Sequence, residues 1–223
     1  MVLPPIKKLS SSTGTPRTRI EAMADDAAAV IRTLGLKQVD VLGFSLGGFQ
    51  AQELTLRHPE LVRKLMLIGT GSRGGKPSHE DKDIPALVYK HATQSVPTKD
   101  NFLFFGRSQA AIEAGNTFWE RRHQRVEQDP PSSPAVMQAQ IEANLHFLPT
   151  LDDVQPFVHL EAIQQPTFIL NGRDDVMIPT INSYYMAQHI PNAQLFIYPD
   201  AGHGAQFQYP KRFLGHALQF LNE

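Results

Sequence analysis

The sequence of 223 residues contains no cysteine. Disulfide bonds, thiolate nucleophiles and cysteine-ligated zinc sites are therefore excluded. No run of apolar residues approaches the ~20 that a membrane-spanning helix needs, and the first residues lack the hydrophobic segment typical of a signal peptide. We therefore expect a cytoplasmic protein that does not bind a membrane.

An excess of charge of one sign is also missing, because 21 basic side chains face 22 acidic ones and the net charge is -1. No dense stretch of Lys and Arg is present, so the sequence does not predict binding to nucleic acid. The hydrophobic fraction of 41% is typical of a globular protein with a sizeable core. The length suits one domain, or one domain with an inserted lid.

Apolar periodicity predicts helices and strands that alternate at both ends of the chain. The near-continuous apolar run 64–68 is typical of a parallel strand that is covered on both faces. Thr18 and Glu21 have capping-box spacing ahead of the first helix. The expected elements are a helix over 19–34, a strand over 39–42, a helix over 46–58, strands over 64–68 and 167–170, a helix over 180–189, a strand over 194–198 and a helix over 210–222. This order indicates an α/β sheet.

The middle of the chain breaks this alternation, because no convincing strand follows Gly71 until Gln155. Ser108 can cap a helix that runs to about residue 127, and Ser133-Pro134 can begin another, with Met137, Ile141 and Leu145 on one face. The expected organisation is a loose lead-in over 1–17, a core over 18–74 and 156–223, and a helical lid over 75–155.

A Gly-x-Ser-x-Gly motif, Gly43-Phe44-Ser45-Leu46-Gly47, lies between the strand 39–42 and the helix 46–58. In such a nucleophile elbow the serine occupies a sharp strand-to-helix turn, and the glycines let the strand and the helix approach closely. The helix N-terminus and the amide of Leu46 then point at the charge that develops on a substrate oxygen. Ser45 is therefore the candidate nucleophile.

Two loops follow predicted strands at the same edge of the sheet and can supply an acid and a base. The loop 171–179 contains Asp174 and Asp175, and the loop 199–204 contains His203. Of the nine histidines, only His203 lies between glycines just after a strand, so it is the candidate base. Spacing alone leaves the choice between Asp174 and Asp175 open.

Together these motifs resemble the serine-nucleophile branch of the α/β-hydrolase fold family. Gly43–Gly48, the loop from Gly172 to Pro179, and Gly202-His203 carry the resemblance. It implies a three-layer sandwich with a mostly parallel sheet and a helical lid. In the family the acid loop commonly reads Gly-x-x-Asp with a proline four residues later, which favours Asp175 over Asp174. The implied enzyme needs no cofactor and no metal.

The resemblance further implies a small, apolar, ester-like substrate, cleaved by an esterase, thioesterase, lactonase, carbon–carbon hydrolase or perhydrolase-like enzyme. Phe44, Phe105, Trp119 and Met177 are the candidate substrate-binding residues. For the aromatic residues of the lid, packing between lid and core is an equally good explanation.

The sequence departs from the family ahead of Ser45, where relatives have several further strands. One of their early loops, often beginning His-Gly, supplies a second oxyanion donor, so here only the amide of Leu46 is assigned. We expect an N-terminally incomplete member, whose strand 39–42 has an open apolar edge through which two copies can associate. A targeting segment could have been lost with the missing part. The alternative function is an impaired hydrolase-fold protein that binds a small ligand or a partner.

Overall fold

The computed structural model describes residues 15–76, 103–124, 132–147 and 157–223. The helices and strands in these ranges are α1 (Ile20–Thr33), β1 (Val39–Phe44), α2 (Leu46–Arg57), β2 (Val62–Ile68), α4 (Gln109–His123), α5 (Pro134–Phe147), β3 (Thr167–Gly172), α6 (Ile181–His189), β4 (Ala193–Tyr198), α7 (Ala205–Gln208) and α8 (Pro210–Asn222), with short 3₁₀ helices at Pro59–Leu61 and Val158–Ala162. Among them, no helix is both long and apolar enough to cross a membrane.

The four strands form one parallel sheet in the order β1-β2-β3-β4. Neighbouring strands end at or within two residues of the same level in the register: Phe44 pairs with Ile68, Ile68 with Leu170, and Gly172 with Tyr198. The loops that follow β1, β3 and β4 therefore leave the same edge of the sheet. The predicted α/β class with a parallel sheet is confirmed.

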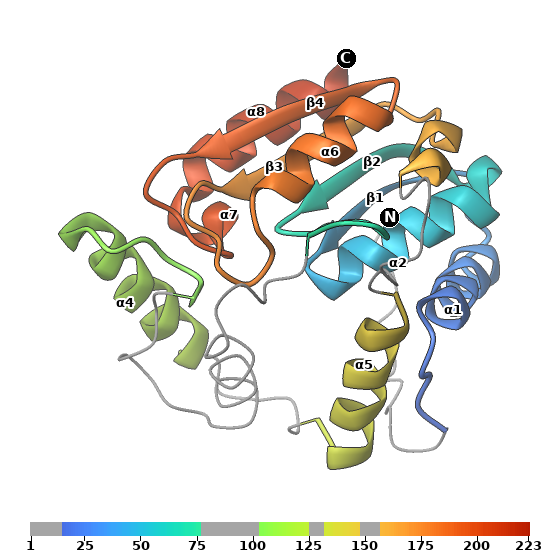
Figure 1. Ribbon diagram of the computed structural model, residues 1–223, viewed down its shortest axis with the longest axis horizontal. Helices are drawn as coiled ribbons and strands as arrows, with labels where there is room; N and C mark the ends of the chain where they lie inside the picture. Colours follow the sequence, from blue (N-terminus) through green and yellow to red (C-terminus); the bar gives the residue numbers. More distant parts are fainter. Residues whose placement is uncertain (1–14, 77–102, 125–131, 148–156) are drawn as a thin grey trace.

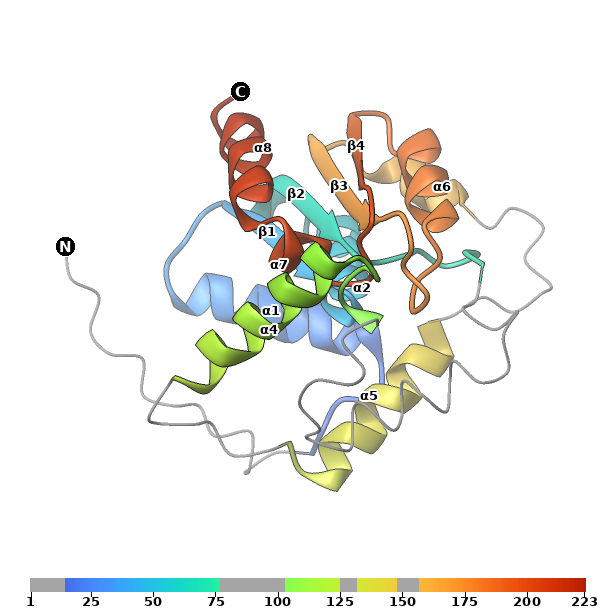
Figure 2. The ribbon, with the colours of Figure 1, turned by 90° about the vertical axis from the view of Figure 1, so that its left-hand side faces the viewer.

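Helices cover both faces of the sheet, as the apolar run of β2 predicts (Figure 1). Leu65 and Leu67 of β2 point to the face covered by α1, α2 and α6. Met66 and Ile68 alternate with them and pack with α7 and α8 on the other face. Figure 2 shows α8 and α6 on opposite sides of the sheet.

Strand β1 lies at one end of the sheet and pairs only with β2 within the described ranges. Leu42, whose neighbour in the register is Met66, is 52% exposed. An apolar residue at the end of a sheet agrees with the expected open edge. Association of two copies through β1 stays a prediction.

The predicted capping box at Thr18 is wrong, because Arg19 is the N-cap of α1 and makes no side-chain cap bond. Glu21 instead accepts a hydrogen bond from Arg73 at 2.9 Å. Arg73 also donates to the buried Glu53 at 2.5 Å, and its guanidinium lies over the ring of Phe147. Arg73 thus links α1, α2 and α5 through contacts that are distant in the sequence.

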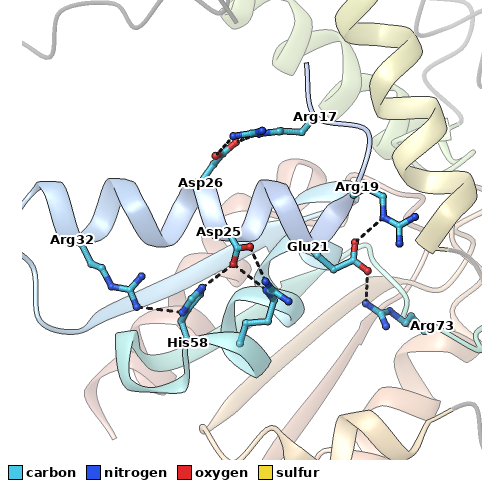
Figure 3. A network of polar contacts seen from close by, with 9 residues as sticks. Arg17, Arg19, Glu21, Asp25, Asp26, Arg32, His58 and Arg73 are labelled. Carbon is cyan, nitrogen blue, oxygen red and sulfur yellow. Dashed lines mark hydrogen bonds and ion pairs between the residues drawn. The ribbon is translucent and has the colours of Figure 1, made fainter. Parts of the chain in front are cut away.

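Polar contacts join the middle and the C-terminal part of α1 to the end of α2 (Figure 3). Asp25 accepts from Arg57 at 2.7 Å and contacts Nε2 of His58 at 2.9 Å. Arg57 and His58 lower the pKa of Asp25 to about 2. Arg32 contacts Nδ1 of His58 as well as Glu60. Because the Arg, Asp and Glu side chains of these ion pairs are largely exposed, the pairs add little to the stability of the fold.

The predicted helical insertion contains α4 and α5, and no strand occurs in its described part, 75–76, 103–124 and 132–147. Helix α4 contacts α7, whereas α5 contacts α1 (Figure 1). The buried face of α5 is Ala139, Ala143 and Phe147. The predicted apolar face of Met137, Ile141 and Leu145 is therefore not the face that packs on the core, because Ile141 and Leu145 are exposed. The remainder of the expected lid and residues 1–14 lie outside the described residues.

The turn from β1 to α2 brings the strand and the helix into close contact. A Cβ on Gly43 would lie 2.3 Å from the carbonyl oxygen of Gly47, and a Cβ on Gly48 would lie 2.4 Å from Oγ1 of Thr70. A Cβ on Gly47 meets nothing within 4 Å. The close approach therefore requires Gly43 and Gly48, and the second glycine of the motif is not needed for space.

We predict that Gly48→Ala destabilises the protein by about 1–3 kcal/mol, because the new methyl group overlaps the buried Thr70. Gly47→Ala is the matched control, and it should be neutral or stabilising by up to ~1 kcal/mol because alanine favours the helix. Urea unfolding followed by circular dichroism measures both. Equal stabilities of the two variants would contradict the packing of the turn.

A second stability prediction concerns the core around β2. Leu65 is fully buried, so Leu65→Ala should lower the free energy of unfolding by about 2–5 kcal/mol. Leu218 of α8 is 57% exposed, and Leu218→Ala should change that free energy by less than about 0.5 kcal/mol. Thermal melts of the two variants beside the unmodified protein test the difference.

Candidate active site

Ser45 has a backbone conformation that non-glycine residues seldom adopt, with φ 54° and ψ -124°. Its amide donates to the carbonyl oxygen of Ile68 at 3.0 Å, and its own carbonyl oxygen accepts from Gly48 at 2.8 Å. The Oγ1 of Thr70 donates to the same carbonyl oxygen at 2.9 Å. Strand β2 therefore holds the strained turn, and Thr70, a polar residue just after that strand, is a support that the sequence reasoning missed.

Asp175 and His203 form a buried hydrogen-bonded pair at the ends of β3 and β4. Nδ1 of His203 lies 2.9 Å from Oδ2 of Asp175, and the two side chains are 1% and 0% exposed. The other carboxylate oxygen accepts from the amides of Met177 at 2.8 Å and Ile178 at 2.9 Å. Both oxygens of Asp175 are thus occupied, which fixes the orientation of the imidazole.

Asp174 takes no part in this pair. Its carboxylate forms a two-pronged ion pair with the neighbouring Arg173, and the Asp174 side chain is 47% exposed. The amide of Asp174 donates to the carbonyl oxygen of Ala201 at 2.9 Å. The structure thus brings Asp175, and not Asp174, to His203.

The second ring nitrogen of His203, Nε2, is buried and has no hydrogen-bond partner within the described part of the chain. The imidazole adjoins Gly69, because a Cβ there would lie 3.3 Å from Nδ1 of His203. The same Cβ would lie 3.1 Å from the ring of Phe44, which precedes Ser45. The loop after β4 therefore meets the elbow at the end of β2, and one nitrogen of the oriented imidazole is left free.

Aromatic side chains surround this imidazole. The ring centroids of Phe44 and Phe104 lie 4.9 and 5.6 Å from that of His203. Phe207 contacts Phe44, and Phe118 of α4 contacts Phe207. Phe207 was not among the candidates, and no signal in the sequence distinguished it from an ordinary core residue of the last helices. The imidazole of His203 therefore has apolar neighbours on the side of Phe44 and Phe104.

The predicted substrate-binding residues fall at different places. Phe44 contacts His203, and Met177 supplies an amide to Asp175. Phe105 is 1% exposed and lines a cavity of about 620 Å³ beside the acid loop, whose walls also include Arg107 and Val176.

Trp119 is a residue of α4, and its ring lies edge-to-face against that of Phe118. Neither Ser45 nor His203 lines the cavity beside the acid loop. Phe105 and Trp119 both contact the ring of Phe118.

Leu46 is the first residue of α2. The amide at this position has no acceptor one turn earlier in its own helix, so it is free to bind an anion at the helix N-terminus. Ser45 precedes it directly, so the amide and the serine hydroxyl are neighbours. This is the arrangement that an oxyanion donor requires.

The chain matches the family model described as alpha/beta hydrolase fold over residues 9–210. It is 28% identical to a 2-hydroxy-6-oxononadienedioate/2-hydroxy-6-oxononatrienedioate hydrolase of Pseudomonas sp., covering 92% of this chain and 70% of the relative. It is 30% identical to a pimeloyl-[acyl-carrier protein] methyl ester esterase of Nitrosomonas europaea, covering 78% and 68%. A solved alpha/beta hydrolase fold protein from Chitinophaga pinensis matches with a TM-score of 0.82 and 32% identity, over 94% of this chain and 74% of that one. The chain therefore belongs to the α/β-hydrolase fold family.

Proposed function

We propose that the protein is a serine hydrolase in which Ser45, His203 and Asp175 act as nucleophile, base and acid. The proposal rests above all on the hydrogen bonding of the two ring nitrogens of His203. Asp175 holds Nδ1 at 2.9 Å, while the buried Nε2 has no partner among the described residues. An imidazole held in this way can accept a proton from a serine hydroxyl and return it.

In the proposed reaction, Nε2 of His203 takes the proton of the Ser45 hydroxyl as Oγ attacks the carbonyl carbon of the substrate. The amide of Leu46 and the N-terminus of α2 stabilise the negative oxygen of the tetrahedral intermediate. His203 then protonates the leaving group, and the acyl group remains on Oγ. A water molecule, deprotonated by His203, releases the acid and regenerates the hydroxyl of Ser45.

The proposed substrate is a small apolar ester or another activated carbonyl compound. The rings of Phe44, Phe104 and Phe207 around His203 support this class, because they offer apolar surface and few polar groups. The relatives support hydrolysis in general, since one is named as an esterase and another as a hydrolase of an oxo-dienedioate. Contact of Phe105, Trp119 and Met177 with the substrate stays a prediction, as does a lid role for α4 and α5.

A fluorophosphonate probe tests the nucleophile. The unmodified protein should be labelled and should hydrolyse a short aryl ester, and Ser45→Ala should abolish labelling and lower kcat at least about 1,000-fold. His203→Ala should lower hydrolysis to a similar extent. Labelling that survives Ser45→Ala, or normal hydrolysis by His203→Ala, would contradict the assignment. A folded protein that neither reacts with the probe nor turns over ester would instead favour the binding-module alternative.

The acid is tested by a pair of neighbouring variants. Asp175→Asn should lower kcat by about 10⁴-fold, because the amide no longer stabilises the charged imidazole or its tautomer. Asp174→Asn should leave kcat within about threefold, because Asp174 pairs with Arg173 at the surface. Circular dichroism of both variants controls for folding. Similar losses in the two variants would argue against Asp175 as the partner of His203.

A further inference from the structure

A short segment ahead of α4, residues 103–108, is bonded to the loop that carries His203. The amide of His203 donates to the carbonyl oxygen of Leu103 at 2.8 Å, and the amide of Gly204 donates to that of Phe104 at 2.7 Å. Leu103 is fully buried, so these bonds are shielded from water. The backbone position of His203 is therefore set by this segment as well as by β4.

The same segment is tied to the loop a second time, through side chains. The hydroxyl of Ser108 donates to Oδ2 of Asp200, and the amide of Ser108 lies 3.4 Å from Oδ1. Ser108 is the N-cap of α4, and its Oγ accepts from the amide of Ala111 at 3.2 Å. One hydroxyl thus connects the first turn of α4 to a residue just ahead of His203.

Asp200 has an uncommon backbone for a non-glycine residue, with φ 48°. Its carbonyl oxygen accepts a hydrogen bond from Nε2 of Gln208. Oε1 of the same Gln208 side chain accepts from the amide of Gly106 at 2.8 Å. A Cβ on Gly106 would lie 2.0 Å from the carbonyl oxygen of Asp200, so the segment and the loop are in direct backbone contact. The bond from Ser108 keeps the pKa of Asp200 below its usual value, which favours the charged acceptor.

We propose that Asp200 and Ser108 are positioning residues that couple the position of the N-terminus of helix α4 to the position of His203. The inference rests on the proposed function, because it assigns these residues to the proposed base. When the N-terminus of α4 is in place, Ser108 holds Asp200 in its left-handed conformation, and the carbonyl groups of Leu103 and Phe104 hold the following loop. When the first turn of α4 moves, both sets of bonds are lost together.

The chain offers a matched control in the other helix of the insertion. Oγ of Ser133 accepts from the amide of Val136 at 3.3 Å at the start of α5, in the same way as Ser108 in α4. Within the described ranges, no hydrogen bond joins Ser133 to the loop of His203. Replacing Ser133 therefore removes a comparable cap without touching the proposed coupling.

The kinetic test uses hydrolysis of a short aryl ester. Ser108→Ala should lower kcat by about 10- to 100-fold with KM changed by less than about threefold, because the loss is in alignment of the base. Ser108→Thr, which keeps the hydroxyl, should restore most of the activity. Ser133→Ala should keep both constants near those of the unmodified protein. Equal effects of Ser108→Ala and Ser133→Ala would overturn the proposal.

The backbone contribution of Asp200 is separated by a second substitution. Asp200→Gly relieves the unfavourable φ but removes the acceptor, so it should resemble Ser108→Ala in kcat. Combining the two substitutions should add little further loss, because they break one interaction. Full additivity of the two losses would contradict a shared role.

Amide hydrogen exchange gives a readout that does not depend on turnover. Ser108→Ala should accelerate exchange in residues 199–208 as well as in α4, whereas Ser133→Ala should accelerate it in α5 alone. Faster exchange confined to α4 would refute the coupling. If the unmodified protein shows neither labelling nor turnover, the proposed function fails, and the exchange pattern still decides whether α4 and the loop of His203 move together.

Discussion

The fold around the site depends on one steric constraint, the absence of side chains at Gly43 and Gly48 where β1 turns into α2. Because nothing projects between them, the helix begins directly after the strand, and Ser45 is left in a backbone conformation with positive φ. Neighbouring groups stabilise this turn: the carbonyl oxygen of Ile68 binds the amide of Ser45, and Thr70 binds its carbonyl oxygen. In this turn the unfavourable backbone conformation is confined to Ser45, and these hydrogen bonds at the end of β2 keep it from relaxing.

The sheet then brings the other two groups to the same edge. Parallel strands in register end together, so the loops after β3 and β4 carry Asp175 and His203 to the end of the sheet where the elbow lies. Asp175 and His203 follow neighbouring strands and meet in a buried pair. The rings of Phe44 and Phe104 lie against His203, and the side chains of the pair are shielded from water.

Local sequence patterns predicted the strands, the elbow and the two loops, because apolar periodicity and glycine turns reflect short-range physics. The predictions from sequence failed where a residue far along the chain determines the contact. Glu21 could cap α1 by spacing, but Arg73, far along the chain, binds its carboxylate instead. In α5 the side chains of Ile141 and Leu145 are exposed, because the face that approaches the core, where α5 contacts α1, is instead formed by Ala139, Ala143 and Phe147. The hydrogen bond between Ser108 and Asp200 joins residues 92 positions apart, and no local sequence pattern predicts it.

The order of the strands also bears on how the molecule assembles. Each strand pairs with its neighbour in the sequence, so β1 with β2, and β3 with β4, can each form over a short connection. The pairing of β2 with β3 closes the long connection through α4 and α5, and loop-closure entropy makes it the most demanding contact of the sheet. The serine belongs to the first half, and the histidine with its carboxylate belongs to the second. The site is therefore created in the same step that joins the two halves of the sheet.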